Sequence, residues 1–264
     1  MENFKQLGIH PDFIKGLNEL GITTPTPIQA EAIPLLLNNK TDLVAQAQTG
    51  TGKTAAYGLP LLQSIDAKQK VIQGLILCPT RELGQQIAKQ LFKFTKYSDK
   101  IFTEAVYGGQ PIDIQIGALK RPTHIVVATP GRLIELVKRK AVDLRKVKTI
   151  ILDEADEMLD MGFADGLEAI LQATPSTKQT ALFSATLPPR IAGIARTYLQ
   201  NPVHVTVERE LVAEGETARV RQMAYIVPRA HKMPALARVL DIEQPTSAIV
   251  FCRTRTEVDE LSET

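Results

Sequence analysis

The sequence predicts an α/β fold in which helices cover both faces of a doubly wound, mostly parallel sheet. Short apolar runs suited to buried strands alternate with segments that have helical apolar spacing. Continuous apolar strands separated by helices are typical of parallel sheets that are buried on both sides. The chain of 264 residues is long enough for one large α/β domain, or for one domain and part of another.

The expected elements follow one another in regular order. Two helices are expected first, over residues 11–20 and 28–37. Strands are expected at residues 43–47, 75–78, 102–106, 124–128, 149–152, 180–183 and 203–207. The clearest helices between them cover residues 55–65, 82–94, 131–138 and 190–198. Because parallel strands all end at the same edge of a sheet, the segments that follow them are expected to meet where ligands bind in such folds.

Residues 47–54, AQTGTGKT, have the sequence of a phosphate-binding loop, with alanine in place of its usual first glycine. Gly50 and Gly52 allow backbone N–H groups to turn toward a phosphate, and the next helix points its N-terminus at the anion. Lys53 is expected to reach the β- and γ-phosphates, and the Thr54 hydroxyl to ligate Mg²⁺. The remaining loop residues expected to bind the nucleotide are Gln48, Thr49 and Thr51.

Polar or glycine-containing segments follow six of the expected strands. Asp153 and Glu154 follow the apolar run 149–152, where a P-loop ATPase places its magnesium-binding carboxylate. We expect Asp153 to hold the metal and Glu154 to act as the general base that polarises the attacking water. Similar segments stand at residues 46–54, 79–82, 107–109, 129–132 and 184–186. Six such strand ends at one edge of a sheet favour a functional rim over turns alone.

Seven short motifs, in order, resemble those of the DEAD-box ATP-dependent RNA helicases. They are Gln29, AQTGTGKT (47–54), PTREL (79–83), GG (108–109), TPGR (129–132), DEAD (153–156) and SAT (184–186). The resemblance covers the chain from Phe4 to about residue 207. It implies a RecA-like P-loop NTPase domain, ATP and Mg²⁺ as cofactors, and ATP-driven remodelling of RNA duplexes or RNA–protein complexes.

The resemblance also implies roles for single residues. Gln29 would select adenine through its side-chain amide, and Phe4 would support the adenine site. Ser184 and Thr186 would hydrogen-bond to residues 153–156 and couple hydrolysis to RNA. The implied catalytic residues are Lys53, Asp153, Glu154, Ser184 and Thr186. An RNA track that contacts the sugar–phosphate backbone without reading bases would be lined by Pro79, Thr80, Arg81, Gly109, Thr129 and Arg132.

One residue departs from the family pattern. Gly84 stands where the family usually has alanine. Because glycine is a poor helix former, we expect it to loosen the first turn of its helix slightly, with little consequence for the chemistry.

The composition changes after about residue 208. We expect a linker at 209–217 between an N-terminal domain, 1–208, and an incomplete second RecA-like domain, 218–264. In that second segment we expect strands at 221–227 and 247–252 around a helix at 231–240. Residues 248–254 resemble the start of the family's second domain, but its later motifs, including arginines that reach the γ-phosphate, do not follow.

An arginine finger contributes about 10³–10⁵ to turnover in phosphoryl-transfer enzymes. Because the sequence contains none, we expect the chain to bind nucleotide weakly, to hydrolyse it very slowly and to separate no strands by itself. A two-strand parallel fragment would leave open edges and apolar faces. We therefore expect the second segment either to associate with a neighbouring protein through residues 247–252 or to be poorly ordered.

Bulk composition adds few constraints. A net charge of +2 neither demands nor excludes nucleic acid. Cys78 and Cys252 both lie in apolar, strand-like runs, so we expect two buried, reduced thiols. No apolar run approaches the length of a membrane span, and the N-terminus lacks the apolar segment of a signal peptide. We therefore expect a cytoplasmic protein without membrane contact.

Other functions stay open at the level of the sequence. Residues 39–42, NKTD, spell the guanine-reading pattern of GTPases, but they precede the phosphate loop, whereas GTPases place the pattern well after it. A non-catalytic module that binds RNA and ATP and needs a partner second domain is the main alternative. A DNA helicase of the same fold is disfavoured by Gln29 and by residues 153–156.

Overall fold

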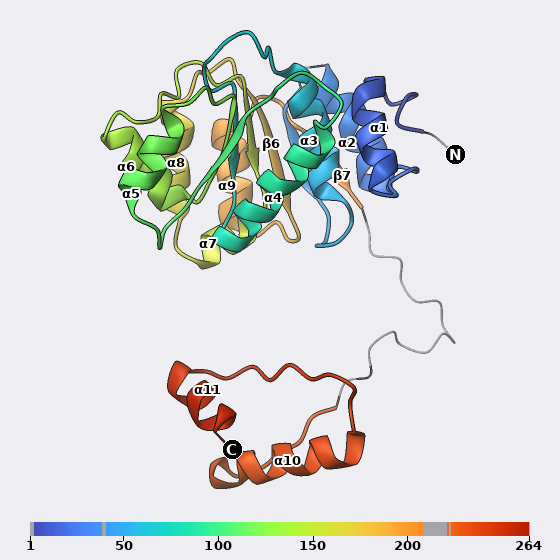
Figure 1. Cartoon of the computed structure of the whole chain (residues 1–264), viewed down its shortest axis with the longest axis vertical. Coiled ribbons are helices and arrows are strands. Elements are labelled where there is room, and N and C mark those ends of the chain that lie inside the picture. The colour runs from blue at the N-terminus through green and yellow to red at the C-terminus, as the bar shows by residue number, and fades with distance from the viewer. Residues whose placement is uncertain (1–2, 39–40, 208–220, 222, 264) are drawn as a thin grey trace. The chain divides into compact units, whose positions relative to one another are not determined.

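The chain forms two compact units, Met1–Arg209 and Glu210–Thr264, each considered by itself (Figure 1). The computed structural model describes residues 3–38, 41–207, 221 and 223–263. The predicted linker at 209–217 lies outside these described residues, as do positions 39 and 40 of the NKTD pattern. The first unit carries the sheet.

A seven-stranded sheet in the order β3-β4-β2-β5-β6-β1-β7 forms the centre of the first unit. Every neighbouring pair is parallel, which confirms the predicted sheet. The strands are β1 (Leu43–Gln46), β2 (Gly74–Leu77), β3 (Thr103–Val106), β4 (Ile125–Ala128), β5 (Thr149–Leu152), β6 (Gln179–Ser184) and β7 (Val203–Thr206). Each overlaps an apolar run predicted from the sequence.

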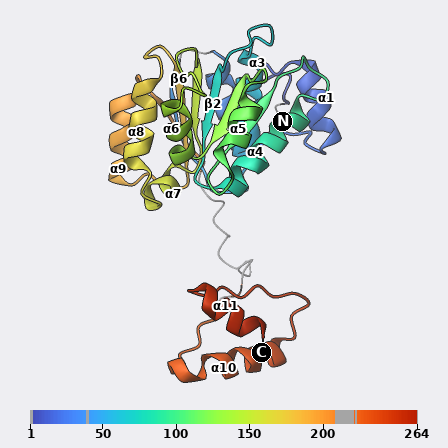
Figure 2. The same cartoon turned by 60° about the vertical axis from the view of Figure 1, so that its left-hand side comes forward.

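Helices cover both faces of the sheet (Figures 1 and 2). One face packs against α1 (Pro11–Glu19), α2 (Pro27–Leu37), α3 (Lys53–Ser64) and α4 (Arg81–Phe94). The other packs against α5 (Ile112–Leu119), α6 (Pro130–Lys138), α7 (Ala155–Asp160), α8 (Ala164–Ala173) and α9 (Pro189–Tyr198). The six helices predicted in this unit are confirmed; α5, α7 and α8 were not among them.

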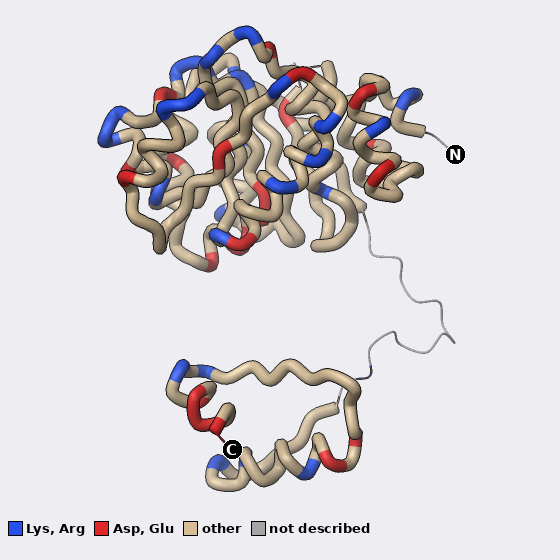
Figure 3. Tube along the Cα trace, in the orientation of Figure 1, with Lys and Arg blue, Asp and Glu red and all other residues tan. Residues whose placement is uncertain are grey.

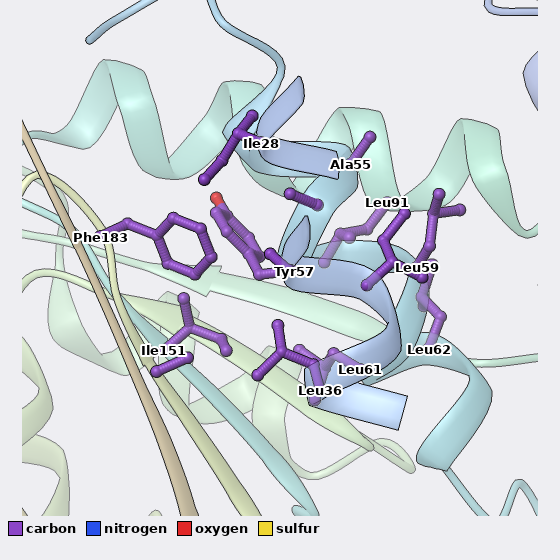
Figure 4. Packing of buried hydrophobic residues seen from close by; sticks show 14 of the residues in the cluster. Ile28, Leu36, Ala55, Tyr57, Leu59, Leu61, Leu62, Leu91, Ile151 and Phe183 are labelled. Atoms are coloured by element: carbon purple, nitrogen blue, oxygen red, sulfur yellow. The ribbon is translucent and has the colours of Figure 1, made fainter. Parts of the chain in front are cut away.

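Alternate residues of each strand supply the two cores. In β6, Phe183 faces the α1–α4 side, whereas its neighbour Leu182 faces the α5–α9 side. Figure 4 shows Phe183 beside Tyr57 of α3, and their rings meet edge-on with centroids 5.2 Å apart. Burying a side chain of this size stabilises a fold by about 1.5–3 kcal/mol. Tyr57 is thereby fixed beneath the carboxyl end of the sheet.

Strand register levels the carboxyl ends of four adjacent strands. Val106, Ala128, Leu77 and Leu152 are register partners across β3, β4, β2 and β5. The polar segments that follow these strands therefore start at the same height on one edge. Toward the other side of the sheet, β5, β6 and β1 are neighbours, so the segments after these three strands are also brought together.

The second unit contains η1 (Arg229–His231), α10 (Lys232–Glu243) and α11 (Arg255–Ser262). The predicted helix at 231–240 is confirmed by α10. The predicted strands at 221–227 and 247–252 are wrong, since none of the described residues in either range is in a strand. A parallel strand exists through its ladder of hydrogen bonds, and the described part of this unit offers no partner strand. Cys252 is partly exposed, which corrects the expectation of a buried thiol.

Candidate nucleotide and RNA site

The phosphate loop joins β1 to α3 and leaves an unpaired cation at its end. Gly50 and Gly52 have φ values of 81° and 91°, in the left-handed region that suits glycine. Gly52 is the N-cap of α3, so the free N–H groups of the helix begin at Lys53. The Lys53 side chain is buried, and its Nζ has no hydrogen-bond partner among the described residues. A buried, unpaired ammonium beside a helix N-terminus suits an anionic ligand.

The start of α2 braces this loop. The Thr26 hydroxyl donates to the Thr51 carbonyl at 2.8 Å, and Gln29 Nε2 donates to the Gly52 carbonyl at 3.0 Å. Gln29 Oε1 also accepts from the Thr26 backbone N–H at 3.0 Å, which completes a capping box. The adenine contact expected of Gln29 stays a prediction. It would have to use the second amide hydrogen and the second lone pair of this buried side chain.

Asp153, directly after β5, is buried and held from two sides. The Tyr57 hydroxyl donates to Oδ2 at 2.7 Å, and the backbone N–H of Glu154 donates to Oδ1 at 3.1 Å. Burial raises the pKa of the Asp153 carboxyl, while the Lys53 ammonium and the Tyr57 hydroxyl oppose that rise. The two hydrogen bonds therefore fix the orientation of the Asp153 carboxylate beside the phosphate loop.

Glu154 adopts a backbone conformation that is rare for its residue type. Its φ and ψ are 52° and 53°, in the left-handed region, where it caps α7. Burial and the neighbouring Asp153 carboxylate raise its pKa. Strained residues cluster at functional sites. The strain observed here is consistent with the role of general base that we expect for Glu154.

Asp156 ties the end of β5 to the segment after β6. Its carboxylate Oδ2 accepts from both the backbone N–H and the hydroxyl of Thr186, each at 2.8 Å. Its own backbone N–H donates to the Ser184 hydroxyl at 3.1 Å. Burial raises the pKa of Asp156, but the hydrogen bonds from Thr186 and Ser184 outweigh burial and lower the pKa overall. The hydrogen bonds expected between residues 184–186 and 153–156 are therefore present.

A cleft of about 170 Å³ opens between these segments. It is lined by Thr49, Lys53, Pro79, Thr80, Glu154, Asp156, Glu157, Met161 and Ala185. The described residues contain no cluster of three or more His, Cys, Asp or Glu able to enclose a metal by themselves. The carboxylates of Glu154, Asp156 and Glu157 line the cleft, and Mg²⁺ is usually held by one or two carboxylates together with phosphate and water oxygens. The expected metal ligands Asp153 and Thr54 are not among the residues that line the cleft, so their role in holding Mg²⁺ stays a prediction.

The RNA-track residues predicted from the sequence lie at the ends of β2, β3 and β4. The Arg81 guanidinium lies over the Tyr107 ring, 5.1 Å from its centroid. Arg132 donates from Nη2 to the Gln110 carbonyl at 2.9 Å, and its side chain is only 9% exposed. Thr80 caps α4, and Thr129 is the N-cap of α6. Exposed Gly109 follows β3, with φ of 81°.

Two expectations fit the structure less directly. Phe4 is 2% exposed and belongs to the α1–α4 core, so a contact of its ring with adenine would require that segment to open. Asp42 lies at the amino end of β1, and its carboxylate accepts from the backbone N–H groups of Thr180 and Gln200 at 2.7 and 2.6 Å. Since Asp42 is already bonded at the edge opposite the phosphate loop, the NKTD pattern does not place a guanine-reading carboxylate at this site.

Three side chains of the site were not named from the sequence. Tyr57 donates a hydrogen bond to Asp153, and the Tyr107 ring lies under the Arg81 guanidinium. Thr26 donates a hydrogen bond to the phosphate loop. A signal existed for Tyr57, because it stands three residues after Thr54 and so shares a helix face with it. Thr26 fits the capping-box pattern with Gln29, and Tyr107 begins the strand-end segment 107–109. Their contacts with Thr51 and Arg81 could not be predicted, because those contacts depend on how distant segments pack.

Strand ends that carry a phosphate loop and an acidic segment define a RecA-like domain of the P-loop class. The chain belongs to the DEAD/DEAH box helicase family, whose profile matches residues 26–194. The DEAD-box ATP-dependent RNA helicase CshA of Bacillus cereus is 45% identical over 263 residues, 100% of this chain and 49% of that protein. CshA of Bacillus subtilis is 44% identical over 260 residues, 98% of this chain and 52% of that protein.

A solved structure agrees with the sequence relatives. The crystal structure of a DEAD box protein from the hyperthermophile Methanococcus jannaschii matches with a TM-score of 0.76 and 36% identity, covering 99% of this chain and 69% of that one. The chain spans about half the length of the curated relatives it matches. Among the described residues, no helix has both the length and the apolar character needed to cross a membrane.

Proposed function

We propose that this chain is the ATP-binding part of an ATP-dependent RNA helicase that remodels RNA duplexes or RNA–protein complexes. The observation that carries the proposal is the division of the carboxyl edge of the sheet. The segments after β1, β5 and β6 bring together the phosphate loop, Asp153 and Thr186, whereas those after β2, β3 and β4 carry the proposed RNA track. The proposed nucleotide site and the proposed RNA track therefore lie along the same edge of the sheet.

The proposed chemistry assigns separate tasks to side chains in and beside the cleft. Lys53 and the N–H groups at the start of α3 neutralise phosphate charge, as the unpaired Nζ suggests. Asp153 and Thr54 hold Mg²⁺, which would supply charge neutralisation and orientation of the phosphates. Glu154, with its raised pKa, accepts the proton of the attacking water. Asp156 couples the nucleotide in this cleft to residues 184–186 through its hydrogen bond from Thr186.

RNA would be held along β3, β4 and β2 by groups that contact phosphate and sugar. Arg81, fixed over Tyr107, presents a guanidinium at this edge. Exposed Gly109 leaves its backbone open to a close approach. Arg132, largely buried, instead holds the segment after β3 against α6, and its role in RNA binding is to position that segment.

The decisive experiment compares the chain with Lys53→Ala and Glu154→Gln in nucleotide binding and in RNA-stimulated phosphate release. We expect Lys53→Ala to weaken ATP binding at least tenfold. Glu154→Gln should keep ATP binding and abolish the slow phosphate release expected of this chain, because a general base contributes roughly 10²–10⁴-fold. ATP binding that survives Lys53→Ala unchanged would refute the proposed nucleotide site.

Competition experiments test the ligand classes. ATP should displace a labelled adenine nucleotide far better than GTP, since the carboxylate of Asp42 is bonded elsewhere. Single-stranded RNA should compete for bound RNA better than DNA of the same sequence. A preference for GTP would instead indicate a GTPase, and a preference for DNA would indicate a DNA helicase.

A non-catalytic module that binds RNA and ATP is the second candidate, because the chain spans about half the length of its curated relatives. Equal phosphate release from the parent chain and Glu154→Gln would favour it. Exposed Ile249 and Phe251 in the second unit support association through residues 247–252 with a protein partner. The domain division at 209–217 and a cytoplasmic location stay predictions from the sequence.

A further inference from the structure

The edge of the sheet opposite the cleft is strongly basic. Five segments lead into the amino ends of β2, β3, β4, β5 and β6, and they cover residues 66–73, 95–102, 120–124, 139–148 and 174–178. Together they contain 12 Lys or Arg and three Asp or Glu, whereas the whole chain has 31 and 29. Because these five strands are adjacent and parallel, all five segments lie on one edge. Figure 3 shows the blue segments gathered along it, at the top of the sheet unit.

Most of these cations are not neutralised by a partner. Within 4.0 Å, ion pairs occupy only Lys96, Arg139 and Arg145 of the 12 in the described part of the chain. Lys178 donates to backbone carbonyls instead. The exposed cations left without an ion pair are Lys68, Lys70, Lys100, Lys120, Arg121, Lys140, Lys146 and Lys148.

A hollow of about 180 Å³ on this edge is lined by three of these cations. Lys70, Arg121 and Lys146 come from the segments before β2, β4 and β5, and Ile72 and Leu119 also line the hollow. The one acidic side chain that lines it, Asp143, is already bonded to Arg145 through both carboxylate oxygens. The hollow therefore offers three cationic groups and no free carboxylate.

Helix dipoles explain only part of this charge. Lys120 directly follows α5, and Arg139 and Lys140 directly follow α6, where cations complement the helix C-terminus. That effect falls off within the last turn of a helix. Lys70 and Lys146 are several residues beyond the nearest helix end, so another cause is needed for them.

We infer that this amino edge is a second RNA-binding surface, which holds the phosphate backbone of duplex RNA flanking the proposed track. The inference rests on the proposed function for its choice of polyanion. Five strands about 4.8 Å apart span roughly 19 Å, long enough to contact several successive phosphates of a duplex. The hollow itself has no aromatic side chain on which a base could stack, so its three cations suit a phosphate backbone. The exposed aromatic residues of this edge, Tyr97 and Phe102, do not line it.

The test compares two triple variants with the same loss of charge. Lys70→Gln/Arg121→Gln/Lys146→Gln removes the wall of the hollow, and Lys5→Gln/Lys15→Gln/Lys89→Gln removes three exposed lysines elsewhere. Binding of a labelled RNA duplex is measured by fluorescence anisotropy between 50 and 200 mM salt. For the first variant we expect the slope of log K against log salt to flatten by about 2.7, at ~0.9 per lost phosphate contact. The second should change it by less than about 1.

Ultraviolet crosslinking followed by mass spectrometry locates the duplex on the parent chain. Crosslinks within residues 66–73, 120–124 and 139–148 support the inference. A slope unchanged in the first triple variant overturns it, as does a preference for anionic phospholipid vesicles over RNA. Arg81→Gln reports separately on the carboxyl edge: if it alone weakens RNA binding, the amino-edge inference fails while the proposed function stands.

Discussion

The Tyr57 hydroxyl donates a 2.7 Å hydrogen bond to Oδ2 of Asp153, joining helix α3 to the end of strand β5. Tyr57 also lies one turn after Thr54 on the same helix. The buried Tyr57 phenol thus fixes the direction in which the Asp153 carboxylate points, from the helix that also carries Thr54.

Tyr57→Phe should therefore both destabilise the fold and weaken the metal site. The change leaves Oδ2 of a buried carboxylate without its donor, which costs about 1–3 kcal/mol. Urea unfolding measures the loss, and titration of Mg²⁺ in the ATP-binding assay should show a higher concentration at half-saturation. Tyr198→Phe is the matched control, since that hydroxyl donates to the carboxylate of Glu168, which is only partly buried. Equal effects from both variants would exclude a special role for Tyr57.

Gly52→Ala should damage the phosphate loop more than Gly50→Ala. Both glycines have left-handed φ values, so each substitution costs about 1–2 kcal/mol in backbone strain. A Cβ at Gly52 would also lie 2.4 Å from Gln29 Nε2, whereas one at Gly50 meets no atom within 4 Å among the described residues. We expect Gly52→Ala to break the bond from Gln29 and to lower ATP affinity more than tenfold.

The Gln29→Ala background separates the two costs. Removing the Gln29 side chain takes away the clash but leaves the strain, so the additional effect of Gly52→Ala should fall to that of Gly50→Ala. The measurement is thermal unfolding of the four single and double variants. Strict additivity would show that the contact with Gln29 does not limit residue 52.

Glu154→Gly should raise stability while abolishing hydrolysis. Glycine adopts the left-handed conformation without strain, and its introduction removes a carboxylate that lies close to Asp153. We expect a gain of about 1 kcal/mol in the free energy of unfolding. Glu157→Gly, inside α7, should instead lose about 1 kcal/mol. A loss of stability in both variants would mean that the backbone at 154 is not strained.

The two cysteines should differ sharply in reactivity. Burial raises the pKa of the Cys78 thiol to about 12, and Asp153 and Glu154 add to the rise. At pH 8 the thiolate is therefore scarce, and alkylation at Cys78 should be roughly 10³-fold slower than at an ordinary exposed thiol. Mass spectrometry of iodoacetamide-treated chain should find label at Cys252 alone, and at both cysteines after unfolding.

The same thiol predicts a loss of stability at alkaline pH. The folded pKa of Cys78 lies above the unfolded value, so the protonated thiol favours the folded state below the unfolded pKa. This contribution should decline as pH rises from about 8.5 toward 12. Cys78→Ala should remove that part of the pH dependence. An identical alkaline profile for the variant would contradict the assignment.

The seven strands and six of the helices of the first unit were predictable, because continuous apolar runs are typical of strands that are buried under helices on both faces. Helices α5, α7 and α8 were not predicted. Gly84 shows where a local rule was incomplete. Helix propensity predicted a slight loosening, but the structure brings Cys78 Sγ to 3.3 Å from the place of an added Cβ, so glycine also permits close packing of α4 on β2. Helix propensity depends only on the segment that contains Gly84, whereas the close approach to Cys78 depends on how α4 packs against a second segment.

The wrong strand prediction has the same origin. Residues 247–252 have the composition of a strand, but a strand needs a hydrogen-bonded neighbour, and composition does not supply one. The place of Arg132 along an RNA track stays a prediction. Its bond to the Gln110 carbonyl, 22 positions away, is a contact that no spacing rule identifies, because the direction of a side chain depends on how distant segments pack.

The ladder between β2 and β5 has a mechanical consequence. It is the single seam at which the three strands proposed for nucleotide meet the three proposed for RNA. The Asp153 N–H donates across it to the Leu77 carbonyl at 2.9 Å. A shift of Asp153 by even a fraction of an ångström would therefore displace the backbone that leads to Arg81 directly through this hydrogen bond. No helix lies between the two.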